Sequence, residues 1–280
     1  MEKQNKSTKG PSVNEMLETI KERMKKIKNK IVVLSGKGGV GKSTVVAELA
    51  AALAKKEKKV GIFDADLHGP SIPKIISPTQ NMMVMGNKII PAEFKPLNIK
   101  IISIDFLLPS EDSPLIWRGP LKGKAIIELL YYTEWGDLDY LLVDLPPGTG
   151  DEPLTIAQSI LNLSGAIVVT IPSLLSEKIV AKAIKFCEIL KIPLLGVIEN
   201  MSYFICPKCG SKYYIFGKGA GEDLAQRMNI QFLGQIPLDP RIREAHDRGV
   251  PFVFEHENTE TAKEIIKIAD KIVKTLEKAR

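Results

Sequence analysis

The chain has 280 residues, 44% of them hydrophobic, and its 39 basic and 33 acidic residues give a net charge of +6. This composition predicts one globular domain with a sizeable core, and the charge excess is too small to indicate a nucleic-acid partner. No run of 18 apolar residues occurs and the first thirty residues are not signal-like, so we expect a cytoplasmic protein with no membrane partner.

The first 28 residues form a segment of their own. Residues 1 to about 11 are rich in Lys, Ser, Asn and Gly, which predicts disorder. Apolar residues at helical spacing then predict a lysine-rich helix from Val13 to about Ile27, with Ser12 as its cap. We expect this helix to pack on the outside of a single domain that spans residues 29–280.

A glycine-rich loop lies between the apolar run Ile31–Leu34, a predicted strand, and the alanine-rich run Val45–Ala54, a predicted helix. In this context the loop matches the pattern G-x-x-x-x-G-K-[ST]. Its glycines let backbone N–H groups approach phosphate oxygens at the positive end of the helix dipole. We predict that Lys42 neutralises phosphate charge and Ser43 coordinates Mg²⁺. The predicted ATP-binding residues of the loop are Gly36, Lys37, Gly38, Gly39, Val40, Gly41, Lys42, Ser43 and Thr44.

Lys37 is a second lysine in the same loop. Lys42 already serves the loop's own phosphates, whereas Lys37 could reach across a two-fold axis. At this residue the sequence resembles the deviant P-loop ATPases, the group of MinD, ArsA and the nitrogenase iron protein. The resemblance implies that Lys37 contacts the nucleotide of the partner subunit in a closed homodimer. The alternative is a solvated lysine beside an anionic ligand.

The next predicted strand, Lys59–Asp64, ends in Asp64, and a second acid, Asp66, lies just beyond it. Parallel sheets bind ligands at the carboxyl ends of their strands. We predict that Asp66 orients the attacking water and that Asp64 assists through the Mg²⁺ shell, because phosphoryl transfer needs positioning more than a strong base. Either acid taken alone could instead be a turn residue.

Strands and helices alternate through the rest of the chain. A hairpin is expected within residues 78–96, strands at 99–106, 138–144, 166–170, 194–199 and 230–234, and helices within 115–132 and at 153–161, 176–190, 219–228 and 259–279. This alternation predicts an α/β fold with a doubly wound, mostly parallel sheet and helices on both faces.

Strand 138–144 ends at Asp144, and an apolar strand ending in Asp downstream of a P-loop is expected to coordinate Mg²⁺, usually through water. Gly148 follows two prolines that stiffen the chain, and we predict that its N–H senses the γ-phosphate. Asp144 alone could also be a strand-terminal cap.

Two residues further along are candidates for the adenine site. Asn200 ends strand 194–199, and an amide can satisfy both the donor and the acceptor edges of adenine. The loop that begins at Pro237 could pack over the base. Asn is equally an ordinary strand terminator, so both interpretations of Asn200 stay open.

Residues 202–216 interrupt the alternation with the sequence Cys206-Pro207-Lys208-Cys209. Two intervening residues let both sulfurs face one metal, but two thiolates are half a site. Cys187 falls at helical spacing with apolar residues, which indicates a core cysteine. The missing ligands most economically come from a second copy of the chain, giving four cysteines across a two-fold axis. Zinc, an iron–sulfur cluster and a redox dithiol all remain open on spacing alone.

Taken together, several stretches resemble the Mrp/ApbC/Nbp ATPases, the iron–sulfur cluster carrier branch of the deviant P-loop class. The resemblance covers about residues 28 to 255 and is carried by residues 36–44, 64–66, 69–71, 117–120, 144–151, 199–202 and 206–209.

This resemblance implies a slow, Mg-dependent ATPase that forms a homodimer. It also implies a labile 4Fe–4S cluster between paired Cys206 and Cys209, which is transferred to recipient apoproteins. The alternatives are a MinD/ParA-like positioning ATPase and a regulatory ATPase stapled by zinc. The C-terminal helix lacks the aromatic insertion face that a membrane-docking relative needs.

Overall fold

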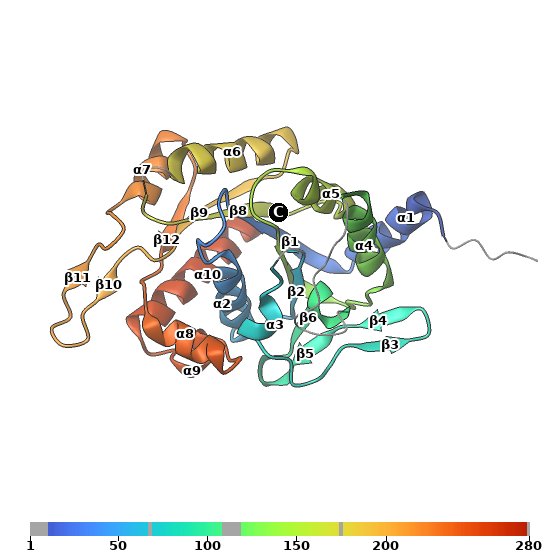
Figure 1. The fold of residues 1–280 in the computed structure, drawn as a ribbon, viewed down its shortest axis with the longest axis horizontal. Helices are drawn as coiled ribbons and strands as arrows, with labels where there is room; N and C mark the ends of the chain where they lie inside the picture. The colour runs from blue at the N-terminus through green and yellow to red at the C-terminus, as the bar shows by residue number, and fades with distance from the viewer. Residues whose placement is uncertain (1–10, 67–68, 108–118, 174–175, 279–280) are drawn as a thin grey trace, which may run out of the picture.

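The computed structural model of the protein describes residues 11–66, 69–107, 119–173 and 176–278, and its centre is a twisted eight-stranded sheet (Figure 1). The strand order is β12-β9-β8-β1-β7-β2-β6-β5, and every neighbouring pair is parallel except β5 with β6. The strands are β1 (Ile27–Leu34), β2 (Val60–Asp64), β5 (Ala92–Phe94), β6 (Ile99–Ser103), β7 (Leu138–Asp144), β8 (Gly165–Thr170), β9 (Leu194–Glu199) and β12 (Phe232–Gln235).

Helices cover both faces of the sheet, which confirms the predicted doubly wound α/β fold. One face packs against α2 (Lys42–Ala54), α3 (Ile72–Ile75), α8 (Pro240–Asp247), α9 (Phe252–Glu255) and α10 (Glu260–Lys278). The other packs against α1 (Val13–Met24), α4 (Gly119–Tyr132), α5 (Asp151–Ser159), α6 (Ser176–Ile189) and α7 (Ala220–Arg227). Within the described residues, no helix is long and apolar enough to cross a bilayer.

The N-terminal helix is shorter than the sequence indicates. A capping box between Ser12 and Glu15 starts α1, which packs on α4, but the helix ends at Met24 and β1 already begins at Ile27. Apolar periodicity missed this boundary because Lys30 is buried: its ammonium donates to the carbonyls of Met24 and Ile27 at 3.3 and 3.0 Å. The predicted disorder of residues 1–10 lies outside the described residues.

Other differences concern short elements. Strand β6 ends at Ser103, and residues 104–107 form a 3-10 turn instead of continuing the strand. Helices α3, α8 and α9 were not predicted, because four to eight residues carry little periodicity. Two small hairpins lie outside the main sheet: β3 (Met83–Met85) with β4 (Lys88–Ile90), as predicted, and β10 (Phe204–Ile205) with β11 (Lys212–Tyr213).

Candidate functional site: a nucleotide site linked to a cysteine hairpin

The predicted phosphate loop joins β1, in the middle of the sheet, to the first turn of α2. Gly39 and Gly41 adopt left-handed backbone angles, with φ of +79° and +76°, which side chains disfavour. Gly41 is the N-cap of α2 and has no side chain that could accept from the N–H groups of the first turn. These N–H groups are therefore available to another acceptor. Lys37, Gly38 and Gly39 are exposed.

Lys42, Ser43 and Asp144 form a compact cluster at the start of α2. The buried Lys42 ammonium is paired with Asp144 Oδ1, and Ser43 Oγ donates to Asp144 Oδ2 at 2.5 Å. The hydroxyl and carboxylate are both hard oxygen donors, and their proximity suits Mg²⁺. The structure thus brings Lys42 and Ser43 together with Asp144, which lies about a hundred residues further along the chain. Their roles in phosphate and Mg²⁺ binding stay predictions.

Asp64 lies beside Asp144, because the two strand ends are in register. Its Oδ2 accepts from Ser103 Oγ at 3.0 Å and from the N–H groups of Ser71 and Ile72 at 3.2 and 3.3 Å. Burial, and then the charge of Asp144, raises the pKa of Asp64 to about 8. Burial also raises the pKa of Asp144, although Lys42 opposes the shift. Burial thus favours the neutral forms of both carboxyls, and a bound cation would favour their ionised forms.

The other two predicted switch residues are placed as follows. The N–H of the half-buried Asp66 donates to Asp64 Oδ1 at 3.3 Å, at the edge of the same acid cluster. The Gly148 N–H donates to the carbonyl of Ser35 at 2.9 Å, at the entrance to the phosphate loop. Contact with a terminal phosphate therefore requires Gly148 to exchange this bond, so its sensing role stays a prediction.

Asn200 braces the phosphate loop. It is 3% exposed, and its Nδ2 donates to the carbonyl of Val40 at 2.9 Å. A Cβ added to Gly41 would lie 2.3 Å from the same nitrogen, so Gly41 is needed for this close approach. Asn200 Oδ1 is the atom suited to accept from an adenine amino group. Pro237 is buried, and the adenine contacts of both residues stay predictions.

Cys206 and Cys209 lie at the tip of the β10–β11 hairpin, which stands out from the body of the protein (Figure 1). The turn is closed by hydrogen bonds from Cys206 N to Ser211 O and from Gly210 N to Cys206 O, both 2.9 Å. Cys209 Sγ is 3.3 Å from Ser211 Oγ, and this contact lowers the pKa of the exposed Cys209 thiol. A readily formed thiolate is what a soft metal requires.

Neither the rest of the hairpin nor Cys187 completes this ligand set. Within the described residues, no group of three or more Cys, His, Asp or Glu side chains could hold a metal ion. Cys187 is buried in the core, and burial raises the pKa of its thiol to about 12. Within the described residues, one chain thus presents two thiols at the hairpin, which is half of the predicted four-cysteine site.

The base of the cysteine hairpin is fastened to the nucleotide side of the sheet. The buried Glu199 accepts from Ser202 Oγ and from Gly221 N. Leu238 N donates to the Tyr203 carbonyl at 2.7 Å, and Ser202 N donates to the Ile236 carbonyl at 2.9 Å. The hairpin is therefore joined both to Asn200, which holds the phosphate loop, and to the loop that contains Pro237.

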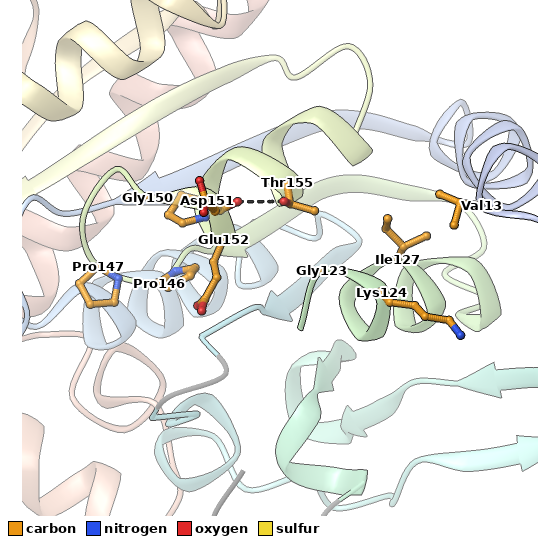
Figure 2. A pocket seen from close by; sticks show the side chains of 11 residues that line it. Val13, Gly123, Lys124, Ile127, Pro146, Pro147, Gly150, Asp151, Glu152 and Thr155 are labelled. Atoms are coloured by element: carbon orange, nitrogen blue, oxygen red, sulfur yellow. Dashed lines mark hydrogen bonds between the residues drawn. The ribbon is translucent and has the colours of Figure 1, made fainter. Parts of the chain in front are cut away.

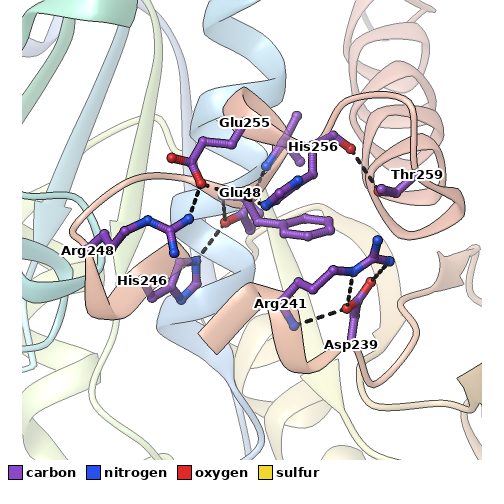
Figure 3. Close-up of polar contacts among 10 residues, drawn as sticks. Glu48, Asp239, Arg241, His246, Arg248, Glu255, His256 and Thr259 are labelled. Atoms are coloured by element: carbon purple, nitrogen blue, oxygen red, sulfur yellow. Dashed lines mark hydrogen bonds and ion pairs between the residues drawn. The ribbon is translucent and has the colours of Figure 1, made fainter. Parts of the chain in front are cut away.

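Two further features of the structure are a pocket beside Pro146 and Pro147 and the buried acid Glu48. A pocket of about 880 Å³ is lined by Pro146 and Pro147, by the start of α5 and by one side of α4 (Figure 2). Glu48 of α2 is buried, and its Oε1 lies 2.7 Å from His246 Nε2 (Figure 3). The Glu48 carboxylate also accepts from the N–H groups of Phe252 and Val253 at 2.8 Å. Sequence spacing gave no sign of this cluster, because its members lie about two hundred residues apart.

The model of the NUBPL iron-transfer P-loop NTPases, in the ParA class, matches residues 26–273. The chain belongs to this family. Its curated relatives include the iron–sulfur cluster carrier proteins of Saccharolobus solfataricus and Methanocaldococcus jannaschii. Each is 50% identical to this chain, over 91% and 92% of it and over 86% and 88% of the relative. A cytosolic Fe–S cluster assembly factor NUBP2 homolog of Dictyostelium discoideum is 43% identical over 85% of this chain and 91% of its own length.

Comparison with solved structures agrees with this family assignment. A nucleotide-binding protein of Archaeoglobus fulgidus, solved in complex with ADP and with cobalt, is 45% identical and has a TM-score of 0.74 over 83% of this chain and 91% of its own. MinD of Pyrococcus horikoshii, with Mg-ADP, is 24% identical with a TM-score of 0.63 over 89% and 97%, which shows the shared fold. The family and fold predicted from the motifs are thus confirmed.

Proposed function

We propose that this protein is an ATP-dependent iron–sulfur cluster carrier of the cytoplasm. Two copies hold one 4Fe–4S cluster between their Cys206 and Cys209 pairs and transfer it to recipient apoproteins. The main support for the proposal is the projecting hairpin with the thiols of Cys206 and Cys209. The base of this hairpin is joined to the predicted phosphate loop through Asn200. Relatives of about 50% identity named iron–sulfur cluster carriers support the choice of a cluster over zinc.

The nucleotide chemistry follows from the cluster of charges at the start of α2. Lys42 binds phosphate oxygens, and Ser43 with Asp144 provides oxygen ligands for Mg²⁺, which neutralises phosphate charge when bound. Asp66 orients the attacking water, and Lys37 reaches the nucleotide of the second copy. This is a slow hydrolysis in which positioning supplies most of the rate.

Coupling between ATP and cluster runs through the end of β9. Asn200 touches the phosphate loop, and Cys206 follows it by six residues on a hairpin whose backbone bonds to Leu238. A shift of the loop on nucleotide binding is thereby passed to the spacing of the two cysteine pairs. ATP binding favours loading of the cluster if it brings the two cysteine pairs to the spacing that fits the cluster. It favours release if it moves them away from that spacing.

The test is reconstitution with iron and sulfide in the absence of oxygen, followed by transfer to an apo 4Fe–4S enzyme whose activity reports delivery. We expect a brown dimer with about four irons per two chains. Cys206→Ala and Cys209→Ala lose the colour and the transfer, whereas Cys187→Ala, the matched control, keeps both. A zinc-bound dimer that takes up neither iron nor sulfide would show the proposal to be wrong.

A further inference from the structure

The cysteine hairpin continues into a run of exposed apolar side chains. Tyr213, Tyr214, Ile215 and Phe216 are 53, 38, 58 and 47% exposed, and we call these four consecutive residues the apolar strip. Single exposed apolar residues are common, but contiguous ones mark a contact surface. The strip begins four residues after Cys209, on the strand that returns from the hairpin tip.

The strip is held at both ends. Tyr213 pairs with Phe204 across the hairpin. The Tyr214 ring lies 6.1 Å from the Tyr203 ring and under the Lys218 ammonium, 5.0 Å away. Gly217, at φ +117°, follows the strip and runs close to Pro172, since a Cβ added there would lie 3.2 Å from the Pro172 carbonyl oxygen. These contacts explain why Tyr214 is the least exposed of the four side chains. They leave Tyr213, Ile215 and Phe216 more exposed to solvent.

A second copy of this chain is the occupant that the hairpin favours. Two thiols need two more ligands, and an isologous two-fold contact supplies them from the same hairpin of the other copy. Residues beside the two-fold axis then face their own equivalents. Tyr213, the first residue of the apolar strip, belongs to the same hairpin as Cys206 and Cys209, and the other three residues follow it directly. The strip therefore lies next to the region where such a contact would form.

Charge explains why this contact would depend on the cluster. Between Glu199 and Glu222 the chain has three lysines and no acidic residue. Two such segments repel each other, whereas a cluster bound by four thiolates is anionic and offsets the repulsion. Lys212 is already paired with Glu260 at 2.7 Å, which orients the hairpin and lessens the excess.

We propose that Tyr213, Ile215 and Phe216 form the apolar contact by which a second copy of this chain packs around the shared cluster and shields it from water. This inference rests on the proposed carrier function, since the cluster brings the two hairpins together. Burial of these three large side chains next to the paired cysteine hairpins contributes strongly to dimer affinity.

The experiment compares wild-type protein with Ile215→Asp, Phe216→Asp and Phe216→Leu after oxygen-free reconstitution. Val84→Asp is the matched control, because Val84 is an apolar residue 66% exposed on the other hairpin, β3–β4. Sedimentation measures self-association and loss of iron to a chelator measures shielding. Thermal unfolding and ATP binding report on the fold.

We expect both Asp variants to bind ATP and melt like the wild type, to self-associate about 100-fold more weakly and to lose iron faster. Phe216→Leu and Val84→Asp should match the wild type. Wild-type protein that takes up no iron would overturn the carrier function and the inference with it. Wild-type loading with unchanged dimers in both Asp variants, or equal loss in Val84→Asp, would overturn the apolar contact alone.

Discussion

The buried acids Asp64 and Asp144 lower the free energy of unfolding when they are ionised. A comparison of Asp64→Asn with the wild type measures the part of this effect that comes from Asp64. Asp64 is 1% exposed, and burial with the nearby Asp144 raises its pKa from 3.8 to about 8. One pKa unit corresponds to about 1.4 kcal/mol, so ionised Asp64 destabilises the fold by on the order of 5 kcal/mol.

The sign follows from the two pKa values. Below pH 4 the carboxyl is neutral in both states and costs nothing. As pH rises toward 8 the unfolded chain releases a proton that the folded chain retains, so stability falls and then levels off above the folded pKa. Asn at position 64 keeps an acceptor for Ser103 and removes this titration.

The assay is urea unfolding of both proteins from pH 5 to pH 8.5, with chelator and without nucleotide. We expect the advantage of Asp64→Asn over the wild type to grow by several kcal/mol across this range, while ATP hydrolysis is lost. Asp139→Asn is the control: Lys28 lowers the pKa of Asp139, so its effect should not change between these pH values. An advantage of Asp64→Asn that is independent of pH would show that the folded protein does not raise the pKa of Asp64.

Three further substitutions test the surroundings of the site. Gly41→Ala should weaken nucleotide binding at least about tenfold in calorimetry, because φ of +76° and the Asn200 amide leave no room for a Cβ, and unchanged affinity would contradict this. Glu48→Ala should lower the free energy of unfolding by on the order of 3 kcal/mol, since two buried N–H groups lose their acceptor and the half-buried His246 loses its partner, and a loss under 1 kcal/mol would contradict it. Lys37→Ala should keep ADP affinity but slow steady-state hydrolysis, and an unchanged rate would remove Lys37 from the reaction.

Much of the nucleotide site was predictable because its signals are local. The phosphate loop has fixed spacing, and acids that end apolar strands must meet at one edge of a parallel sheet, as Asp64 and Asp144 do. The fold followed from the alternation of strands and helices for the same reason. The two-residue spacing of Cys206 and Cys209 predicts that both thiols lie at one turn, and the structure places them there. Their role as half of a metal site stays a prediction.

What the sequence could not predict depends on partners chosen in three dimensions. Nothing in the spacing says that Asn200 donates to Val40, or that Glu48 accepts from His246. The predicted end of the N-terminal helix was wrong because Lys30 was counted as a solvent-exposed residue. Its ammonium is buried and donates to backbone carbonyls, which the spacing of apolar residues does not reveal.

In the proposed carrier, two chains share one cluster through Cys206 and Cys209. Native mass spectrometry of protein purified without oxygen tests it most directly, because the mass gives the number of chains and the metal content together. The account predicts two chains plus one 4Fe–4S cluster, and separate chains without metal for Cys209→Ala. A monomer that carries its own metal, or a dimer that carries zinc in place of iron and sulfide, would contradict it.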